Sequence, residues 1–375
     1  MNCCALSRAA KSKTCPDFRE SEKKNSITHQ KIDMAEERTE ISTLGEFGLI
    51  EHLTRNNETR NASTLVSVGD DGAVIDHFGK HTVVSTDLLI EGIHFDLMYT
   101  PLKHLGYKSV VVNLSDIYAM NATPTQITLS IAFSNRFSVE SLSEFYEGVY
   151  AACARYGVDL VGGDTSSSQK GFIISVTALG EVTPHQYVKR SGAQKGDLIC
   201  VSGYLGGAFL GLTLLEREKK IFAETGAQPD LENQDYIVGR LLKPEARKDI
   251  IEFFGDAEIL PTSMIDVSDG LSSDLLHLCK HSNLGCVLYE EKIPVHESAR
   301  QFAYKLEIDP TACALSGGED YELLFTMAQS DYEKVLLNEQ ISIIGYMTEA
   351  AEGKQIITRG GNRHELVAQG WNHAR

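Results

Sequence analysis

The sequence predicts a mixed α/β protein, with helices and strands interleaved, that is built from two domains. Short runs rich in Val, Ile and Leu alternate with longer segments whose apolar residues recur at helical spacing, as in α/β architectures. The alternation pauses in the polar segment 183–197 and then starts again. With 375 residues, 42% of them hydrophobic, the chain can bury two cores. We place the boundary near 184–195, which gives an N-terminal domain over 34–185 and a C-terminal domain over 186–375.

Three helices are expected in the first domain. Apolar residues at helical spacing predict an amphipathic helix over 44–55. The apolar segment 102–120 is too long for an ordinary strand, so we expect a helix there. A third helix over 138–157 has Ser138 as its N-cap and Gly157 at its end. Runs of β-branched residues predict strands between these helices, over 63–76, 81–90, 125–133, 158–164 and 172–182.

The second domain is expected to repeat this alternation. "LICVSG" predicts a strand, and the "GGAFLGLTLLERE" that follows soon after predicts a helix whose two glycines, Gly206 and Gly207, allow close packing. Polar residues predict loops over 219–236. A second helix over 271–283 is expected to be closed by Gly285. Further strands are expected over 262–266, 286–295, 321–327 and 341–349.

The first 33 residues differ from the rest of the chain. They carry seven Lys and Arg against four Asp and Glu, a net charge of +3, whereas the remainder carries −20. The segment lacks the apolar stretch of a secretory signal. Met34 then opens a stretch typical of a natural start. We therefore interpret 1–33 as a disordered tail or an over-extended reading frame.

Charge and cysteine content limit the classes of function. A net charge of −17 argues against nucleic acid as a partner, because phosphate backbones are bound by Lys and Arg. The eight cysteines form no C-x-x-C pair, so we expect neither a disulfide framework nor a zinc site, and a reducing, cytoplasmic setting. The most apolar stretch, 198–215, is shorter than a membrane helix and contains four glycines.

Carboxylates repeatedly follow apolar runs. Examples are "VGDDG", "VVSTD", "VVNLSD", "LVGGD" and "MIDVSDG". A single such Asp is usually a turn or cap residue, but residues at the same ends of neighbouring strands cluster in space. Two unit charges 4 Å apart repel by about 4 kcal/mol at an effective dielectric constant of 20. Bound Mg²⁺, which prefers oxygen ligands and is often shared with phosphate, removes that repulsion. The sequence therefore predicts a magnesium–nucleotide site without a basic pocket.

Common nucleotide-binding motifs are absent from the sequence. It contains no G-x-x-x-x-G-K-[ST] loop and no protein-kinase H-R-D or D-F-G set. "GYLGG" has the wrong spacing for a dinucleotide loop, so helix packing is the favoured role of its glycines, with nucleotide binding as the alternative. No H-E-x-x-H motif occurs among the 12 histidines.

An ordered set of motifs resembles the thiamine-monophosphate kinases of the aminoimidazole ribonucleotide synthetase superfamily. The set comprises "GEFGLI", "VGDDGAVI", "VVSTDLLIEGIHF", "VVNLSDIYAMNATP", "LVGGDTS", "RSGAQKGD", "IDVSDGLSSDL", "LSGGEDYELLFT" and "GWNH", and it spans 45–373. The resemblance implies the two-domain aminoimidazole ribonucleotide synthetase-like fold, with the N-terminal sheet pairing across a homodimer. It also implies Mg²⁺-dependent transfer of the ATP γ-phosphate to thiamine monophosphate, which yields thiamine diphosphate.

The resemblance also implies roles for individual residues. Those implied as ligands of several Mg²⁺ ions are Asp71, Ser85, Thr86, Asp87, Asp116, Asp164, Asp266 and Asp269. Those implied as nucleotide contacts are Tyr146, Gly163, Asp164, Arg190 and Ser268. His94, Glu319 and Trp371 are implied as contacts to the acceptor, and no residue is expected to form a covalent intermediate.

Two kinds of alternative stay open at this point. One is another ATP-using relative, such as a cyclo-ligase, a selenophosphate synthetase or a hydrogenase-maturation protein. Cys3, Cys4 and Cys15 lack the lysine- and glycine-rich setting of selenophosphate synthesis, and the chain ends in "NHAR" without the cysteine that maturation needs. The other alternative is a non-catalytic acidic protein that binds metal ions.

Overall fold

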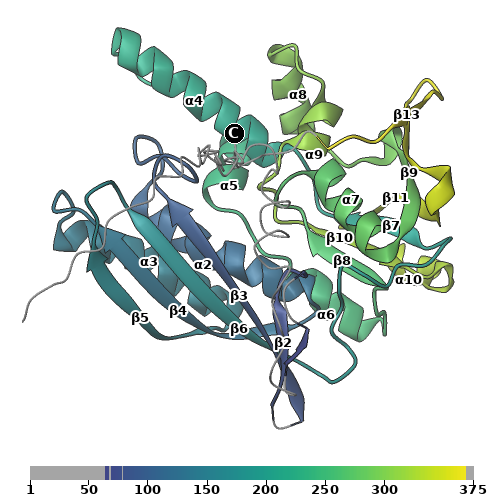
Figure 1. The fold of residues 1–375 in the computed structure, drawn as a ribbon. Coiled ribbons are helices and arrows are strands. Elements are labelled where there is room, and N and C mark those ends of the chain that lie inside the picture. The colour runs from purple at the N-terminus through teal and green to yellow at the C-terminus, as the bar shows by residue number, and fades with distance from the viewer. Residues whose placement is uncertain (1–63, 67–68, 78, 369–375) are drawn as a thin grey trace, which may run out of the picture.

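The computed structural model describes residues 64–66, 69–77 and 79–368. The expected helix over 44–55, the 1–33 segment and Trp371 lie outside these residues. The described part of the chain forms a six-stranded sheet and a seven-stranded sheet. Each sheet has its own helices (Figure 1). The first sheet ends at Val182 and the second begins at Leu198, and the expected boundary at 184–195 falls between them.

The first sheet has the strand order β1-β2-β3-β6-β4-β5. Neighbouring strands are antiparallel except β4 and β5, which are parallel because a helical crossover joins them. Two helices, α2 (Leu102–Ala119) and α3 (Val139–Tyr156), lie on one face of the sheet (Figure 1). The strands are β1 Thr64–Val66, β2 Ala73–His77, β3 Lys80–Ile90, β4 Thr123–Phe133, β5 Asp159–Ser167 and β6 Ile173–Val182.

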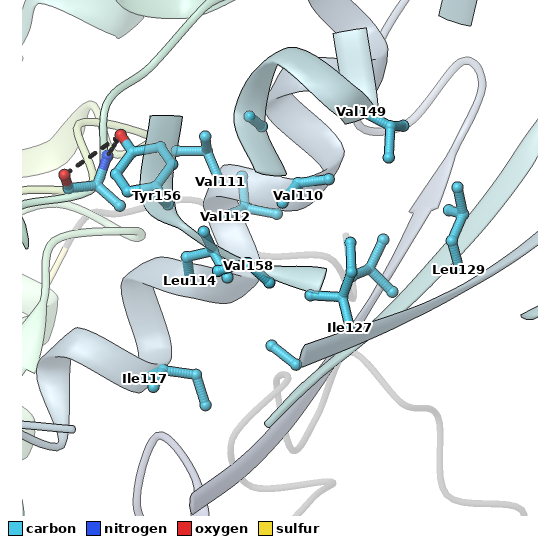
Figure 2. Close-up of a cluster of buried hydrophobic side chains, with 14 of the residues drawn as sticks. Val110, Val111, Val112, Leu114, Ile117, Ile127, Leu129, Val149, Tyr156 and Val158 are labelled. Atoms are coloured by element: carbon cyan, nitrogen blue, oxygen red, sulfur yellow. Dashed lines mark hydrogen bonds between the residues drawn. The ribbon is translucent and has the colours of Figure 1, made fainter. Parts of the chain in front are cut away.

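Helix α2 forms the centre of the first core. Most of its side chains are buried, which explains why its apolar residues are not confined to one face of the helix. Figure 2 shows Val110 and Leu114 of α2 near Ile127 of β4, among side chains from α3 and the sheet. The predicted helix over 102–120 is thereby confirmed.

Helices α2 and α3 cross at backbone contact distance. A Cβ atom placed on Gly106 of α2 would lie 1.9 Å from the carbonyl oxygen of Phe145, and one on Gly148 of α3 would lie 1.9 Å from that of Lys103. Side chains at these positions would force the helices apart. The ends of α3 match the sequence prediction, because Ser138 accepts a hydrogen bond from the backbone N–H of Ser141 and Gly157 has a φ of 71°.

The second sheet has the strand order β13-β12-β9-β11-β7-β10-β8. Its strands are β7 Leu198–Ser202, β8 Ser263–Asp266, β9 Leu284–Tyr289, β10 Leu323–Met327, β11 Ile341–Glu349, β12 Lys354–Ile357 and β13 Arg363–Glu365. The helices of this domain are α4 Gly207–Thr225, α5 Asp235–Leu242, α6 Lys248–Asp256, α7 Leu271–Ser282, α8 Glu297–Lys305, α9 Pro310–Ser316 and α10 Tyr332–Val335. Short 3₁₀ turns occur at Glu290–Lys292, Gln329–Asp331 and Ala350–Glu352.

Three sequence predictions in this domain are wrong in detail. The strand expected over 286–295 is β9, which ends at Tyr289 and is followed by the 3₁₀ turn Glu290–Lys292. The expected loop over 219–236 is helical at both ends, because α4 continues to Thr225 and α5 begins at Asp235. Helix α7 is closed by Asn283, which has a φ of 54°, whereas Gly285 lies within β9. Asn tolerates the left-handed conformation that Gly usually supplies at a helix end. No helix among the described residues is long and apolar enough to cross a membrane.

Candidate active site

A cavity of about 770 Å³ lies where the two domains meet. Its walls come from β3 and α2 of the first domain and from α4 and the segments 266–269 and 317–321 of the second. One part of the lining is acidic, with aspartates from both domains. Another part is apolar, formed by Ile93, Phe95, Tyr99, Phe209, Leu212, Leu241 and Leu242.

Three carboxylates from distant parts of the sequence meet in the acidic part. Asp71 lies in the turn before β2, Asp116 on α2 and Asp266 at the end of β8. One carboxylate oxygen of each lies within 4.8 Å of those of the other two. Such an arrangement of oxygen donors suits a hard divalent cation.

Hydrogen bonds from neighbouring side chains hold these carboxylates in place. The Ser85 hydroxyl donates to Asp116 at 2.5 Å, and the Ser115 hydroxyl donates to Asp266 at 2.7 Å. Ser115 and Asp116 are consecutive on α2, so this helix contributes one ligand and orients another from the second domain. The remaining Asp71 oxygen, Oδ2, is buried and has no hydrogen-bond partner.

Arg190 connects the linker between the domains to the acidic turn. Its guanidinium forms an ion pair with Asp71, and its backbone N–H donates to Asp70 at 2.6 Å. The side chain of Asp71 is only 3% exposed, so the ion pair is shielded from water. One carboxylate of the cluster is therefore partly neutralised by a residue that also lines the cavity.

The cluster shifts the pKa values of its own members upward. Burial, followed by repulsion from Asp71, raises the pKa of Asp87 to about 6 and that of Asp266 to about 8. Burial and the charges of neighbouring aspartates raise the pKa of Asp116 well above its usual value. The pKa of Asp71 is also raised, chiefly by burial. A bound cation would reverse these shifts, because it favours the ionised carboxylates.

The segment 317–321 approaches the aspartates from the second domain. Glu319 and Tyr321 have φ values of 57° and 51°, a conformation that costs roughly 1–3 kcal/mol for a residue other than Gly. Hydrogen bonds from the Glu319 N–H to Ser268 O (2.7 Å) and from the Tyr321 N–H to Val267 O (2.9 Å) hold this conformation. The segment is therefore fixed to the same loop that contains Ser268 and Asp269.

The apolar part of the cavity is closed by contacts between the domains. His94 lies in the turn after β3, where its Nδ1 accepts a hydrogen bond from Ile90 N at 3.0 Å. In the loop that follows, Asp96 pairs with Lys219 of α4 at 2.6 Å, and the Tyr99 hydroxyl donates to Glu216 at 2.9 Å. These contacts join the His94 loop to α4.

The cavity brings together most of the residues predicted from the sequence. They are Asp71, Ser85, Thr86, Asp87, His94, Asp116, Arg190, Asp266, Ser268, Asp269 and Glu319. Their roles as metal, nucleotide or acceptor contacts stay predictions.

Three predicted residues lie elsewhere in the chain. Gly163 and Asp164 are exposed on β5, the strand at the opposite edge of the sheet from β1. Tyr146 lies in a shallow surface groove on α3, beside Tyr150. None of the three lines the cavity. The strand-end argument grouped Asp164 with Asp71, but the structure does not bring them together.

Several cavity residues were missed by the sequence analysis. Lys108 lies on α2 two turns before Asp116, so the spacing of four between Lys108, Val112 and Asp116 is a signal that could have revealed it. Tyr99 and Lys219 line the cavity through tertiary contacts that no local pattern indicates.

The glycine turn before α4 has a packing role. Asp320 is fully buried, and its carboxylate accepts a hydrogen bond from Gly206 N at 2.7 Å. A Cβ on Gly207 would lie 3.2 Å from the Arg240 side chain, and one on Gly211 would lie 2.2 Å from the Ile237 carbonyl of α5. The favoured helix-packing role is confirmed, and an internal carboxylate occupies the position that a phosphate would take at this helix N-terminus.

Comparisons with known proteins identify the family. Residues 69–182 match the family described as AIR synthase related protein, N-terminal domain. The thiamine-monophosphate kinase of Bacillus subtilis is 31% identical over 339 residues, which cover 88% of this chain and 99% of the relative. The thiamine-monophosphate kinase of Buchnera aphidicola from Schizaphis graminum is 35% identical over 338 residues, covering 88% and 98%.

Solved structures give the same result. The structure described as "AaThiL complexed with AMPPCP and TMP" aligns with a TM-score of 0.78 and 31% identity over 90% of this chain and 99% of the other. Thiamine monophosphate kinase from Aquifex aeolicus aligns with a TM-score of 0.70 and 30% identity over 85% and 98%. Since relatives more than 30% identical cover most of its length, this chain belongs to the thiamine-monophosphate kinase family.

Proposed function

We propose that this protein transfers the γ-phosphate of ATP to thiamine monophosphate, giving thiamine diphosphate and ADP. The observation that carries the proposal is the meeting of three aspartates from separate segments in a cavity that also has an apolar part, within a chain of this family. The acidic part suits metal-bound phosphates. The apolar part, with Tyr99 and Phe209, suits the two rings of the acceptor.

Mg²⁺ fits the residues of the acidic part. The donors are oxygens, Asp71 Oδ2 is buried without a partner, and the raised pKa values indicate carboxylates that need a counter-charge. The residues that would hold the ions are Asp71, Ser85, Thr86, Asp87, Asp116, Asp266 and Asp269. When bound, Mg²⁺ would neutralise the phosphate oxygens and let two phosphorylated molecules approach each other.

Direct transfer without a phosphoenzyme fits the side chains of the site. The acceptor is a phosphate monoester with a second pKa of about 6, by analogy with phosphoserine, so its attacking oxygen is ionised near neutral pH without a general base. The protein's task is then to align the acceptor and to offset charge. The guanidinium of Arg190 lies at the cluster and can contact phosphate oxygens.

A homodimer would account for the predicted nucleotide contacts that lie outside the cavity. Strand β5 is an exposed edge strand, and exposed edges readily pair with another chain. A second copy that covers this edge would bring its own Tyr146, Gly163 and Asp164 toward an interface. We also expect the metal and nucleotide site to lie near the interface of this homodimer.

Two sequence predictions about the cellular setting stay predictions. The five described cysteines are all free and buried, which agrees with a reducing, cytoplasmic compartment. The net charge of −17 still argues against nucleic acid as a partner.

Product analysis tests the proposed function. The purified protein is incubated with thiamine monophosphate, ATP and Mg²⁺, and the products are separated by chromatography. Equal amounts of thiamine diphosphate and ADP are expected. Formation of ADP with free phosphate alone would contradict the proposal. Mg²⁺-dependent binding of ATP in calorimetry separates the enzyme from a protein that only binds metal ions.

A further inference from the structure

An ion pair with one buried partner joins the two domains at the cavity. The ammonium of Lys108 on α2 lies 3.1 Å from Oε2 of Glu319 in the segment 317–321. The Lys108 side chain is 5% exposed, whereas the Glu319 side chain is 31% exposed. Both residues line the cavity, and the carboxylate is the more exposed of the two charged groups.

Lys108 differs from the other basic residues of this cavity. Among the described residues, Arg190 and Lys219 also line it, but Arg190 pairs with Asp71 of the acidic cluster. Lys219 lies on α4 and joins the His94 loop through Asp96. Lys108 belongs to neither of these groups. It lies eight residues before Asp116 on α2, so the two residues are about 12 Å apart along the helix axis at 1.5 Å per residue.

The two partners of this pair differ in their surroundings. The backbone of Glu319 is held in a left-handed conformation by its hydrogen bond to Ser268, and its side chain is the exposed partner of the pair. Lys108 extends from a helix packed against backbone on its other side. A bound molecule can therefore draw Glu319 away without moving either domain.

The proposed acceptor, thiamine monophosphate, has one positive and one negative group, as the ion pair does. Its thiazolium ring bears a permanent positive charge, and its phosphate is a dianion above the second pKa of about 6. We propose that, in the free protein, Lys108 and Glu319 neutralise each other, and that the charged groups of the bound acceptor replace each of them as the other's partner. When the acceptor binds, Glu319 turns to the cationic ring, and the Lys108 ammonium hydrogen-bonds the phosphate. This inference rests on the proposed function and adds Lys108 as a phosphate-binding residue.

The exchange explains how an acceptor with two charged groups can bind in the cavity with a small loss of electrostatic free energy. A buried charge without a partner is unfavourable, and removing one partner of a buried pair leaves the other uncompensated. Here each protein charge has a partner before and after binding. A neutral molecule of the same shape would leave the ion pair intact. It would gain neither the contact of its ring with Glu319 nor the contact of a phosphate with Lys108.

Binding of two ligands to a set of variants tests the exchange. Thiamine monophosphate and thiamine, which lacks the phosphate, are titrated calorimetrically at pH 8 with Mg²⁺ and a non-hydrolysable ATP analogue. Lys108→Met should weaken thiamine monophosphate binding by about tenfold or more, the loss expected for a charge-assisted hydrogen bond. The same variant should bind thiamine as tightly as the wild type or more tightly, because Glu319 is then free. Glu319→Gln should weaken thiamine more than thiamine monophosphate, because Lys108 is then free for the phosphate, and Lys108→Arg should keep the preference for the phosphate.

Lys103→Met is the matched control. Lys103 lies on the same helix and pairs with Glu147 at 3.0 Å, but it is exposed and outside the cavity. It should change neither affinity. Equal losses of both ligands in Lys108→Met would overturn the exchange and leave Lys108 as a support for Glu319. A wild-type protein that forms no thiamine diphosphate would instead count against the proposed function.

Discussion

Replacing Asp266 by Asn should abolish activity and yet stabilise the metal-free protein. The Asp266 carboxylate oxygen lies within 4.8 Å of those of Asp71 and Asp116. Two unit charges at that distance repel by about 3.5 kcal/mol at an effective dielectric constant of 20. The rise of the Asp266 pKa from 3.8 to about 8 corresponds to a free energy on the order of 5 kcal/mol. The Coulomb energy and the pKa shift both indicate that ionised Asp266 destabilises the metal-free folded protein by several kcal/mol.

The sign of this effect depends on pH. Below 3.8 the carboxyl is protonated in the folded and the unfolded chain, so it contributes no penalty. Between 3.8 and about 8 the unfolded chain releases the proton and the folded chain keeps it, so folding stability falls as pH rises. The gain from Asp266→Asn should therefore be small at pH 5 and largest at pH 8 and above.

Thermal melting in a chelator, at pH 5 and pH 8, measures the effect. A rise in melting temperature of several degrees at pH 8 is expected, and added Mg²⁺ should stabilise the wild type more than the variant. Asp256→Asn, at an exposed position at the end of α6, is the control and should show no gain that grows with pH. A variant that melts below the wild type at pH 8, with equal stabilisation by Mg²⁺, would refute the argument.

Four further outcomes are expected. Gly106→Ala should destabilise the fold by several kcal/mol in urea unfolding, because its Cβ would meet the Phe145 carbonyl at 1.9 Å; an unchanged unfolding midpoint would contradict the close crossing. Sedimentation at micromolar concentration should show a homodimer, and a fully active monomer would exclude the interface proposed at β5. Rapid-quench labelling with γ-labelled ATP should give no phosphoenzyme, whereas stoichiometric label chased into thiamine diphosphate would overturn direct transfer. Deletion of 1–33 should leave activity and melting temperature unchanged, and a loss of several degrees would show that this segment packs on the rest.

Helices and strands were predictable where the apolar pattern of the sequence extends over many residues. The run around Val110 and Val111 has strand-like composition, but its length indicated a helix, and packing on all sides explains the composition. Shorter elements were missed. Helix α5 has eight residues and contains Gly239, and it is stabilised by its packing against Gly207 and Gly211 of α4. Such packing partners are far apart in sequence and leave no local signal.

The site was predictable in part from carboxylates that follow apolar runs. Asp266 ends β8 as the strand-end argument expected, whereas Asp87 lies inside β3, so the argument was wrong about its position although both residues line the cavity. The same argument grouped Asp164 with them, although β5 lies at the far edge of the sheet. Lys108 was missed because a lysine in a helix is usually a surface residue, as Lys103 of the same helix is, and only the spacing of Lys108 from Asp116 distinguishes the two.

The glycine crossing between α2 and α3 limits how this enzyme could be redesigned. Because Gly106 and Gly148 each face a backbone carbonyl of the other helix, larger residues are excluded at both positions, and mutating one does not make room at the other. Lys108 and Asp116 lie on the helix that this crossing holds. A library for altered acceptor choice can therefore vary side-chain length and charge at position 108, but it cannot shift the helix to admit a bulkier acceptor. Room for such a molecule has to come from α4, where Phe209 and Leu212 line the apolar part of the cavity.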